Sequence, residues 1–399
     1  MIKLVHITTS PLFLTFFRGQ VAYMKARGLR LGFITSPGDW LEQFVQREGV
    51  EAYPVLMHRR ITPLHDVLAL VRIYRILRRI RPHIVHAHTP KGGLLGTVAA
   101  WLCRVPVRIY HIRGLPHLAA SGAKRRLLCW SEKVACRLAH QVLCVSHSIR
   151  QIAIEEGLCP AHKIKVLASG SGQGVDAEER FNPSRFDERE KQKLRSQLGI
   201  PEEALVVGFV GRIVRDKGIV ELAEAWRNLR EDYPQAHLLL VGDYEQQDPV
   251  PGEVRKLLDN DPHVHITGWL TDTALYYALM HLLVLPSYRE GFPNTPLEAA
   301  AMELPVVATD IPGCRDAVEK EQTALLVPPR DARALERAIR CYLDSPLLRQ
   351  QHGQAGRRRV LQYFRQEILW QALYEEYVSL LRSKNISPAQ EQSPCGHPC

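Results

Sequence analysis

The chain has 399 residues, of which 46% are hydrophobic and 24% charged, values typical of a globular protein with two domains of ordinary size. No apolar run approaches the roughly 18 residues needed to cross a bilayer, so the sequence predicts no membrane span. The formal charge of +10 calls for a partner of opposite sign. Because the basic runs contain no nucleic-acid-binding motif and no interleaved aromatic residues, we expect a lipid or a diphosphate rather than a nucleic acid.

The first half of the chain alternates short apolar runs with helical patterns. Strands are predicted at residues 3–7, 31–35, 84–87, 107–110, 142–145 and 164–167, and helices at residues 20–27, 64–80, 93–102 and 124–139. This alternation predicts a parallel sheet with helices on both faces. We assign residues 1–175 to a first Rossmann-like, doubly wound α/β domain.

A polar, charge-dense stretch at residues 176–200 is interpreted as an interdomain linker. The pattern then restarts, with strands predicted at residues 206–210, 237–241, 265–267, 283–285, 306–308 and 324–327, and helices at residues 218–229, 273–280, 296–302 and 332–343. Residues 201–365 are assigned to a second Rossmann-like domain, residues 366–382 to a last helix that could cross back to the first domain, and residues 383–399 to a disordered tail. Two such domains are expected to face a cleft at the carboxyl ends of their strands.

The N-terminal ten residues resemble a strand and lack the charged and apolar regions of a signal peptide, so we expect a cytoplasmic protein. The nine cysteines show no paired spacing, and most lie among apolar residues, where a reduced cysteine behaves as a small hydrophobe. Cys395 and Cys399 could bind a metal, but metal-binding spacings normally come as two coupled pairs. We therefore expect no bound metal.

The segment 290–298 is the most informative in the chain. Glu290 and Glu298 are joined by a loop of Gly, Pro, Asn and Thr residues between a predicted strand and a predicted helix. Such a loop presents backbone N–H groups to an anionic ligand, and the carboxylates could accept sugar hydroxyls. Glu290 could equally be an exposed loop residue. Glu298 also fits a capping box that begins at Thr295, with proline at the first helical position.

A second segment, residues 211–218, follows a predicted buried strand and opens a helix. Its Arg212 and Lys217 would project at the strand end. Two fixed cations there suit a leaving diphosphate, whose charge grows as a glycosidic bond breaks. The alternative is a solvated basic turn.

Together, residues 288–298 and the Gly-Arg…Lys-Gly pattern of residues 211–218 resemble the signatures of the retaining glycosyltransferases of family 4, which have the GT-B fold. The resemblance implies that Glu298 holds the ribose of a nucleotide sugar and that Glu290 is a catalytic residue near the donor sugar. It also implies that the two basic residues of the second segment neutralise the diphosphate, so no metal or other cofactor is needed. The residues bordering the diphosphate and the sugar would be Gly291, Phe292, Asn294 and Thr295.

Two further motifs receive simpler explanations. Residues 169–176 contain Gly-x-Gly-x-Gly, but no helix opens after them, which argues against a dinucleotide-binding fingerprint. The family resemblance makes this segment a hinge and a wall of the cleft. Asp259 and Asp261 could suggest a metal site, but they precede Pro262, where a turn accounts for them.

The first domain is expected to bind the acceptor. His88 and Lys91 follow one predicted strand, and His111 and Arg113 end the next. Many family members have a histidine where Arg113 aligns, so either His111 or His88 substitutes for it, or Arg113 binds an acceptor phosphate directly. A strand-end histidine can also be purely structural. We assign His111 and Arg113 to catalysis, and His88, Lys91 and Arg18 to the acceptor side.

The helix predicted at residues 64–80 combines apolar residues with Arg72, Arg75, Arg78 and Arg79. Cations near a helix C-terminus are favourable in any soluble protein. They also suit an amphipathic helix lying on anionic lipid, to which the basic run at residues 124–126 adds. The sequence leaves both interpretations open, so peripheral association with the inner face of the cytoplasmic membrane remains an alternative.

The sequence thus predicts a retaining glycosyltransferase of GT-B fold that moves a hexosyl or N-acetylhexosaminyl group from a nucleotide diphosphate sugar, expected to be a UDP-sugar. Residues 88–93 and 113–116 resemble the subgroup that builds capsules and O-antigens. The resemblance implies a glycan or a polyprenyl-diphosphate-linked sugar as the acceptor. Two alternatives are a nucleotide-sugar epimerase of the same fold and a non-catalytic partner in a glycan-assembly complex.

Overall fold

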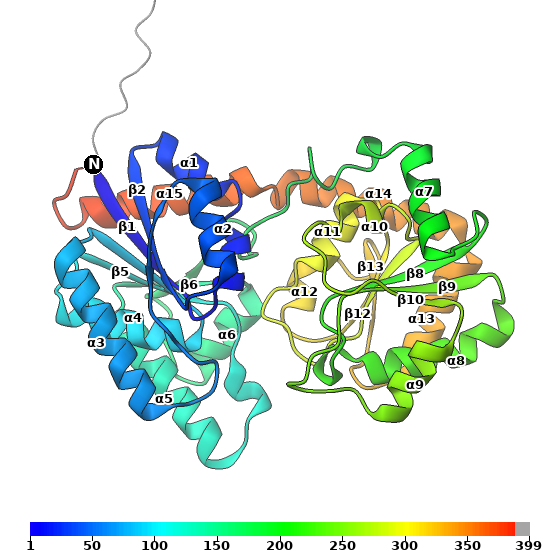
Figure 1. The fold of residues 1–399 in the computed structure, drawn as a ribbon, viewed down its shortest axis with the longest axis horizontal. Coiled ribbons are helices and arrows are strands. Elements are labelled where there is room, and N and C mark those ends of the chain that lie inside the picture. Colours follow the sequence, from blue (N-terminus) through cyan, green and yellow to red (C-terminus); the bar gives the residue numbers. More distant parts are fainter. Residues whose placement is uncertain (388–399) are drawn as a thin grey trace, which may run out of the picture. The chain divides into compact units, whose positions relative to one another are not determined.

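The computed structural model describes residues 1–387, which form two compact α/β units (Figure 1). The first unit comprises residues 1–173 and 366–387, and the second comprises residues 174–365. The expected tail from residue 388 onward, with Cys395 and Cys399, lies outside the described residues.

The first unit is built on a parallel sheet with the strand order β3-β2-β1-β4-β5-β6-β7. Its strands are β1 (Ile2–Ile7), β2 (Leu29–Thr35), β3 (Glu51–Pro54), β4 (Ile84–His88), β5 (Val107–Ile112), β6 (Gln141–Cys144) and β7 (Ile164–Val166). Its α-helices are α1 (Gln20–Ala26), α2 (Asp39–Glu48), α3 (Pro63–Ile80), α4 (Pro90–Leu102), α5 (Gly122–Leu138), α6 (His147–Glu155) and α15 (Gln366–Arg382). Two 3-10 turns are η1 (Pro11–Phe17) and η2 (Pro116–Ala119).

Two helical layers cover this first sheet. Successive side chains of a strand point to opposite faces, so Leu4 of β1 packs with α1, α2 and α15, whereas Val5 packs with α3 and α4. Tyr110 of β5 lies on the same face as Val5 and packs near α5. Helices α3, α4 and α5 therefore form one layer, and α1, α2 and α15 form the other.

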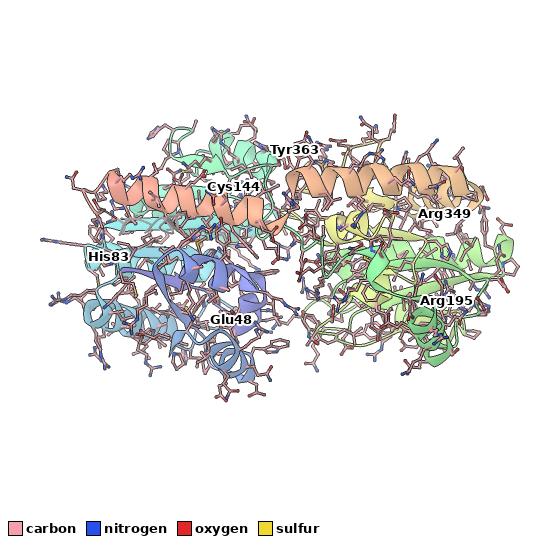
Figure 2. The ribbon with its side chains drawn as sticks, turned by 90° about the horizontal axis from the view of Figure 1, so that it is seen from above. Glu48, His83, Cys144, Arg195, Arg349 and Tyr363 are labelled. Carbon is pink, nitrogen blue, oxygen red and sulfur yellow. The ribbon has the colours of Figure 1, made fainter. Side chains whose placement is uncertain are left out.

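The second unit is built on a parallel sheet with the order β10-β9-β8-β11-β12-β13. Its strands are β8 (Leu205–Val210), β9 (Ala236–Val241), β10 (Val264–Ile266), β11 (Leu282–Leu285), β12 (Val306–Thr309) and β13 (Ala324–Val327). Its helices are α7 (Glu188–Leu198), α8 (Ile219–Asp232), α9 (Gly252–Asn260), α10 (Ala274–Tyr277), α11 (Thr295–Ala301), α12 (Cys314–Ala317), α13 (Ala332–Asp344) and α14 (Pro346–Tyr363), with 3-10 turns η3 (Pro183–Arg185) and η4 (Arg215–Lys217). Figure 2 shows Arg349 and Tyr363 on the long helix α14.

Each sheet has one point where the strand order reverses. In the first sheet this point lies between β1 and β4, and in the second it lies between β8 and β11. The loops that leave two such neighbouring strands run in opposite directions, which opens a crevice at the carboxyl ends of the strands. The segments 211–218 and 286–298 follow β8 and β11, so both motifs that the sequence predicts for a donor site lie at the reversal point of the second sheet.

The predicted fold of two parallel α/β domains is confirmed. The sequence pattern did not predict several elements of the structure, among them β3, α2, α6, α9 and α14. The strand β3 reads Glu-Ala-Tyr-Pro, which offers no apolar run. Helix α14 buries glycines instead of an apolar stripe, and a Cβ on Gly353 would lie 1.9 Å from the carbonyl oxygen of Glu303. This helix therefore packs through close contact between backbones, and its sequence lacks the apolar periodicity that predicts most helices.

Residues 176–200, interpreted as a linker, are folded in the second unit. Phe181, Leu194 and Ile200 belong to its core. Helix α7 opens with a capping box, in which the Asp187 carboxylate accepts from the N–H of Glu190 at 2.8 Å and the Glu190 carboxylate accepts from the N–H of Asp187 at 3.1 Å.

The last helix, α15, packs in the first unit. It contacts α1 and contributes Trp370, Leu373, Tyr377 and Leu381 to the core beneath β1 and β2. Across residues 1–387, none of the helices combines the length and apolar content that a membrane span requires.

Candidate functional site

The two loops at the reversal point of the second sheet are joined through their backbones. The N–H of Tyr288 donates to the carbonyl of Asp216 at 2.9 Å. Gly218, at φ 72°, packs so tightly that a Cβ would lie 2.0 Å from the carbonyl oxygen of Pro286. Both the left-handed backbone and the lack of space require glycine here. The glycine of the Lys-Gly pattern thus permits the two loops to meet.

Lys217 and Glu290 form an ion pair at this edge of the sheet. The Lys217 Nζ donates to the Glu290 Oε1 at 2.5 Å, and the side chains are only 19% and 13% exposed. Partial burial strengthens such a pair relative to one on the surface. The structure therefore brings together the cation predicted for the diphosphate and the carboxylate predicted for the sugar.

Arg212 is held by two carboxylates that the sequence interpretation missed. Its Nη1 donates to Glu245 at 2.9 Å, and its Nη2 lies 3.8 Å from Asp216. Asp216 also accepts from Arg289 at 2.9 Å. Asp216 stands inside the Gly-Arg…Lys-Gly motif, so its position was a usable signal. Glu245 follows β9 and carries no local motif.

The backbone at Glu290 and Gly291 is packed against the start of α12. Gly313 has φ 63°, and a Cβ there would lie 2.7 Å from the carbonyl oxygens of both residues. Next to it, burial raises the pKa of the Cys314 thiol, and the Glu290 carboxylate raises it further. Cys314 is therefore a neutral thiol buried next to this loop.

Glu298 is oriented by a neighbouring helix and not by a capping box. Helix α11 begins at Thr295 with Asn294 as its N-cap, so the predicted box starting at Thr295 is wrong. The Glu298 carboxylate instead accepts a hydrogen bond from the hydroxyl of Tyr277 in α10 at 2.8 Å. Burial raises the pKa of Glu298, against the lowering effect of this hydrogen bond. Tyr277 is a further residue that the sequence interpretation missed.

The other predicted donor-site residues support the same loop. Phe292 packs at the edge of the core, with its ring 5.8 Å from that of Phe364. The Asn294 side-chain amide donates to the carbonyl of Gly174 at 3.4 Å. Gly291 and Thr295 are partly buried.

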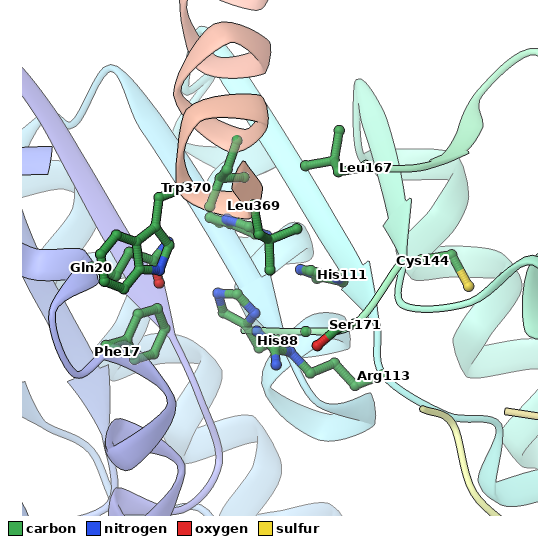
Figure 3. Close-up of a pocket in the computed structure, with 13 residues that line it drawn as sticks. Phe17, Gln20, His88, His111, Arg113, Cys144, Leu167, Ser171, Leu369 and Trp370 are labelled. Atoms are coloured by element: carbon green, nitrogen blue, oxygen red, sulfur yellow. The ribbon is translucent and has the colours of Figure 1, made fainter. Parts of the chain in front are cut away.

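The first unit contains a pocket beside the carboxyl ends of β4 and β5, bounded on one side by α15 (Figure 3). His88, His111 and Arg113 point into it, together with Ser171 and Trp370. Three of the residues predicted for the first domain therefore line one cavity.

Four buried histidines lie side by side at this end of the sheet. His6 Nδ1 and His88 Nε2 are 3.0 Å apart, and the hydroxyl of Tyr377 bonds to His86 Nδ1 at 2.7 Å. The rings of His86 and His111 are stacked, with centroids 5.4 Å apart. Burial lowers the pKa of all four histidines, and the nearby charge of Arg113 lowers each pKa further. All four are therefore neutral at pH 7.

Within this cluster, the two predicted histidines differ. The Nε2 of His88 is engaged with His6, which gives His88 a structural contact, whereas the Nδ1 atoms of both His88 and His111 have no hydrogen-bond partner among the described residues. The sequence interpretation missed His6, His86 and Tyr377. The His-x-His spacing in β4, which places two rings on one face, was an available signal.

Arg113 is a cation without a counter-ion among residues 1–387. Its guanidinium lies over Phe13, 4.7 Å from the ring centroid, and a Cβ on Gly172 would lie 2.1 Å from its Nη1. Its Nε has no hydrogen-bond partner in the described part of the chain, and burial lowers its pKa. A buried, unneutralised guanidinium favours an anionic ligand.

Lys91 and Arg18 lie in different surroundings. Lys91 is partly buried and donates to Asp66 at 2.7 Å and to the carbonyl of Arg60, so it fixes the segment before α3. Arg18 is exposed at the end of η1.

Within residues 1–387, two groups of side chains have the spacing of metal ligands. The ligand atoms of His6, His86 and His88 lie within 4.8 Å of one another, as do those of His117, Cys129 and Glu156. The first group contains no carboxylate and is close to the Arg113 charge, which disfavours a dication. In the second, Glu156 already accepts from His117 and Arg125. At the predicted Asp-x-Asp, Asp261 accepts from the indole N–H of Trp226 at 2.9 Å.

The chain is similar to known glycosyltransferases. Residues 15–170 match the family described as "Glycosyl transferase 4-like domain", and residues 204–345 match "Glycosyl transferases group 1". The chain is 30% identical over 381 residues to a capsular polysaccharide biosynthesis glycosyltransferase, CapM, of Staphylococcus aureus, covering 95% of this chain and 98% of that protein. It is 27% identical to the UDP-Gal:alpha-D-GlcNAc-diphosphoundecaprenol alpha-1,3-galactosyltransferase of Escherichia coli, with 73% and 74% covered.

Among solved structures, Anabaena HepE in complex with UDP superimposes with a TM-score of 0.78 at 20% identity, covering 95% of this chain and 99% of that one. The fold is therefore GT-B, and the protein is a glycosyltransferase. The chain belongs to glycosyltransferase family 4, as its motifs predict.

Proposed function

We propose that this protein is a retaining glycosyltransferase that moves a hexosyl or N-acetylhexosaminyl group from a UDP-sugar to a glycan or a polyprenyl-diphosphate-linked sugar. The observation that carries the proposal is the Lys217–Glu290 pair at the reversal point of the second sheet. It combines a cation for the diphosphate with a carboxylate for the sugar at one edge of the sheet.

The donor assignment follows from the surrounding groups. Lys217 and Arg212 neutralise the two phosphates, and Glu298, held by Tyr277, accepts the ribose hydroxyls. The backbone of residues 291–295 borders the diphosphate and the sugar. Because two cations already face the diphosphate, the reaction requires no metal ion. The choice of UDP is supported by the relatives, since HepE is described with UDP and the E. coli enzyme with UDP-Gal.

The acceptor assignment rests on Arg113 and its pocket. A diphosphate-linked acceptor would supply an anion to this buried guanidinium, whose Nε has no hydrogen-bond partner among residues 1–387. His111 lines the same pocket and would hydrogen-bond an acceptor oxygen. The S. aureus and E. coli relatives, named for capsule synthesis and a diphosphoundecaprenol acceptor, support surface polysaccharide biosynthesis.

The proposed chemistry retains the anomeric configuration. The bond from the anomeric carbon to the β-phosphate oxygen breaks, and the acceptor hydroxyl oxygen attacks the same face of the sugar. Its proton passes to the departing phosphate oxygen, so UDP leaves as the new glycosidic bond forms. Lys217 and Arg212 stabilise the charge that develops on the phosphate. Glu290 orients the sugar and supports the positive charge at its anomeric carbon.

The test is incubation of the protein with UDP-glucose, UDP-galactose and their N-acetylamino counterparts, without acceptor. Slow release of UDP from one donor supports a transferase. Formation of an epimeric UDP-sugar would instead establish an epimerase, and the absence of binding to every donor would establish a non-catalytic partner.

A further inference from the structure

A histidine, a cysteine and a glutamate converge in the first unit, and none of the three lines its pocket. His117 lies in η2, Cys129 lies in α5, and Glu156 is the C-cap of α6. One ligand atom from each residue lies within 4.8 Å of the other two. Zinc binds such atoms at about 2.0–2.3 Å, so small side-chain movements would bring the three around one ion. We call these residues the His-Cys-Glu cluster.

Hydrophobic packing holds the three elements together without a ligand. Helix α5 packs against η2. Leu115 at the start of η2, Cys136 of α5 and Ala153 of α6 belong to one buried core cluster. The side chain of His117 is completely buried, whereas that of Glu156 is 26% exposed. The His-Cys-Glu cluster is therefore fixed by the core on one side and accessible to an ion and to water on the other.

The existing hydrogen bonds leave the ligand atoms available. The His117 Nε2 and the Glu156 Oε2 are 2.5 Å apart, and Arg125 donates to the Glu156 Oε1 at 2.8 Å. The Arg125 side chain is 48% exposed, so it can turn into solvent. The Cys129 thiol is free and takes part in none of the hydrogen bonds among residues 1–387. The Nδ1 of His117 has no hydrogen-bond partner in the described part of the chain, so the ring proton can move there when Nε2 binds a metal.

The chemistry of the three donors selects the kind of ion. A structural hydrogen bond would explain His117 and Glu156, but it would leave the free Cys129 thiol beside the same atoms unexplained. Thiolate and imidazole ligands suit Zn²⁺, whereas Mg²⁺ and Ca²⁺ prefer oxygen. A thiolate and a carboxylate also supply two negative charges to offset the dication. The three-histidine group in the pocket supplies none.

We propose that the His-Cys-Glu cluster binds one Zn²⁺ ion through His117, Cys129 and Glu156, with water as the fourth ligand. The Cys129 thiol releases its proton to solvent, and the His117 ring proton moves from Nε2 to Nδ1, so the affinity for the ion rises with pH. The bound ion ties the segment that follows β5 to α5 and α6. The site shares no residue with the two donor loops, so it does not rest on the proposed transfer reaction.

The test is titration of the reduced, metal-stripped full chain with Co²⁺ alone and with Zn²⁺ alone. The parent for these titrations carries Cys395→Ser and Cys399→Ser, because the sequence allows those two cysteines a metal. We expect one Co²⁺ per chain, with the near-ultraviolet absorption of a cobalt–thiolate bond, which Zn²⁺ removes and Mg²⁺ does not. Zn²⁺ should also raise the midpoint of thermal unfolding. The absence of stoichiometric binding, or equal competition by Mg²⁺, would overturn the proposal.

Matched variants identify the ligands. Cys129→Ser should abolish the cobalt–thiolate absorption, and both Cys129→Ser and Glu156→Gln should weaken Zn²⁺ binding at least about tenfold. Glu156→Gln keeps an oxygen that can accept a hydrogen bond from His117, and thermal unfolding without metal checks that each variant folds. The control is Cys341→Ser, which changes an exposed cysteine of α13 and should keep both the absorption and the affinity.

A cobalt–thiolate absorption that survives Cys129→Ser would refute the assignment. So would a Zn²⁺ affinity that is the same in Glu156→Gln as in the parent. UDP affinity should be unchanged in all three variants, so failure of the metal site is distinguishable from failure of the proposed donor site.

Discussion

Opposite effects of two substitutions in the Lys217–Glu290 pair distinguish a diphosphate site from a purely structural ion pair. In Lys217→Ala the cation that would face the phosphates is gone. In Glu290→Gln the lysine remains and loses the carboxylate that now accepts its hydrogen bond at 2.5 Å. We therefore expect Lys217→Ala to weaken UDP binding, and Glu290→Gln to leave it unchanged or tighter.

The magnitude follows from the hydrogen bond involved. A charge-assisted hydrogen bond contributes about 1.5–3 kcal/mol, which corresponds to roughly a tenfold to hundredfold change in Kd. The structure favours the lower end of this range, because Lys217 must give up its ion pair with Glu290 before it can bind a phosphate. Turnover should fall in both variants: in Glu290→Gln because the sugar loses its carboxylate, and in Lys217→Ala because the leaving diphosphate loses its cation.

Calorimetric titration with UDP at fixed salt measures the affinities, and UDP release from the active donor measures turnover. Lys191→Ala is the control, since that lysine pairs with Glu188 on α7, outside the crevice. Unchanged UDP affinity in Lys217→Ala would move the diphosphate elsewhere. Near-normal turnover in Glu290→Gln would refute its placement at the sugar.

Two other predictions test single groups. Tyr277→Phe removes the hydrogen bond that orients Glu298 and should weaken UDP binding several-fold. The control, Tyr342→Phe, loses a comparable buried hydrogen bond to His352 and should lower only the stability of the fold. Equal UDP affinities in the two variants would contradict the role of Glu298. Burial raises the pKa of Glu132 in the folded protein to about 7, above its ordinary value of 4.5. The protonated Glu132 side chain therefore contributes fully to the stability of the fold below pH 4.5, and this contribution is lost as the pH rises through 7. In denaturant unfolding, the free energy of unfolding of Glu132→Gln should rise by about 3 kcal/mol relative to that of the parent between pH 4.5 and pH 8. A constant difference between the two free energies across that range would refute the raised pKa of Glu132.

Much of the fold could be predicted because its signals are local. The core strands are short runs such as Leu282–Leu285, which are buried on both faces and therefore apolar throughout. The positions of Lys217 and Glu290 could also be predicted from their neighbours in the sequence, since each stands in a loop between a strand and a helix. Parallel topology then brought the two loops to one edge of the sheet.

The rest could not be predicted because it depends on contacts between distant segments. Tyr277 reaches Glu298 from another helix, and the carboxylate of Glu245 reaches Arg212 from the loop after β9. The capping box at Thr295 was wrong because helix α11 has Asn294 as its N-cap, and the Glu298 carboxylate accepts a hydrogen bond from the distant Tyr277 instead. Likewise, only the folded structure shows that Arg113 is buried with its guanidinium over Phe13.

The most direct test of the central claim is the anomeric configuration of the product. The active UDP-α-sugar should be incubated with a polyprenyl-diphosphate-linked sugar, and the new linkage should be assigned from its proton coupling constant by nuclear magnetic resonance. The proposed mechanism predicts an α-linked product formed in step with UDP release. A β-linked product would contradict the retaining mechanism, and UDP release without transfer to this acceptor would contradict the acceptor assignment.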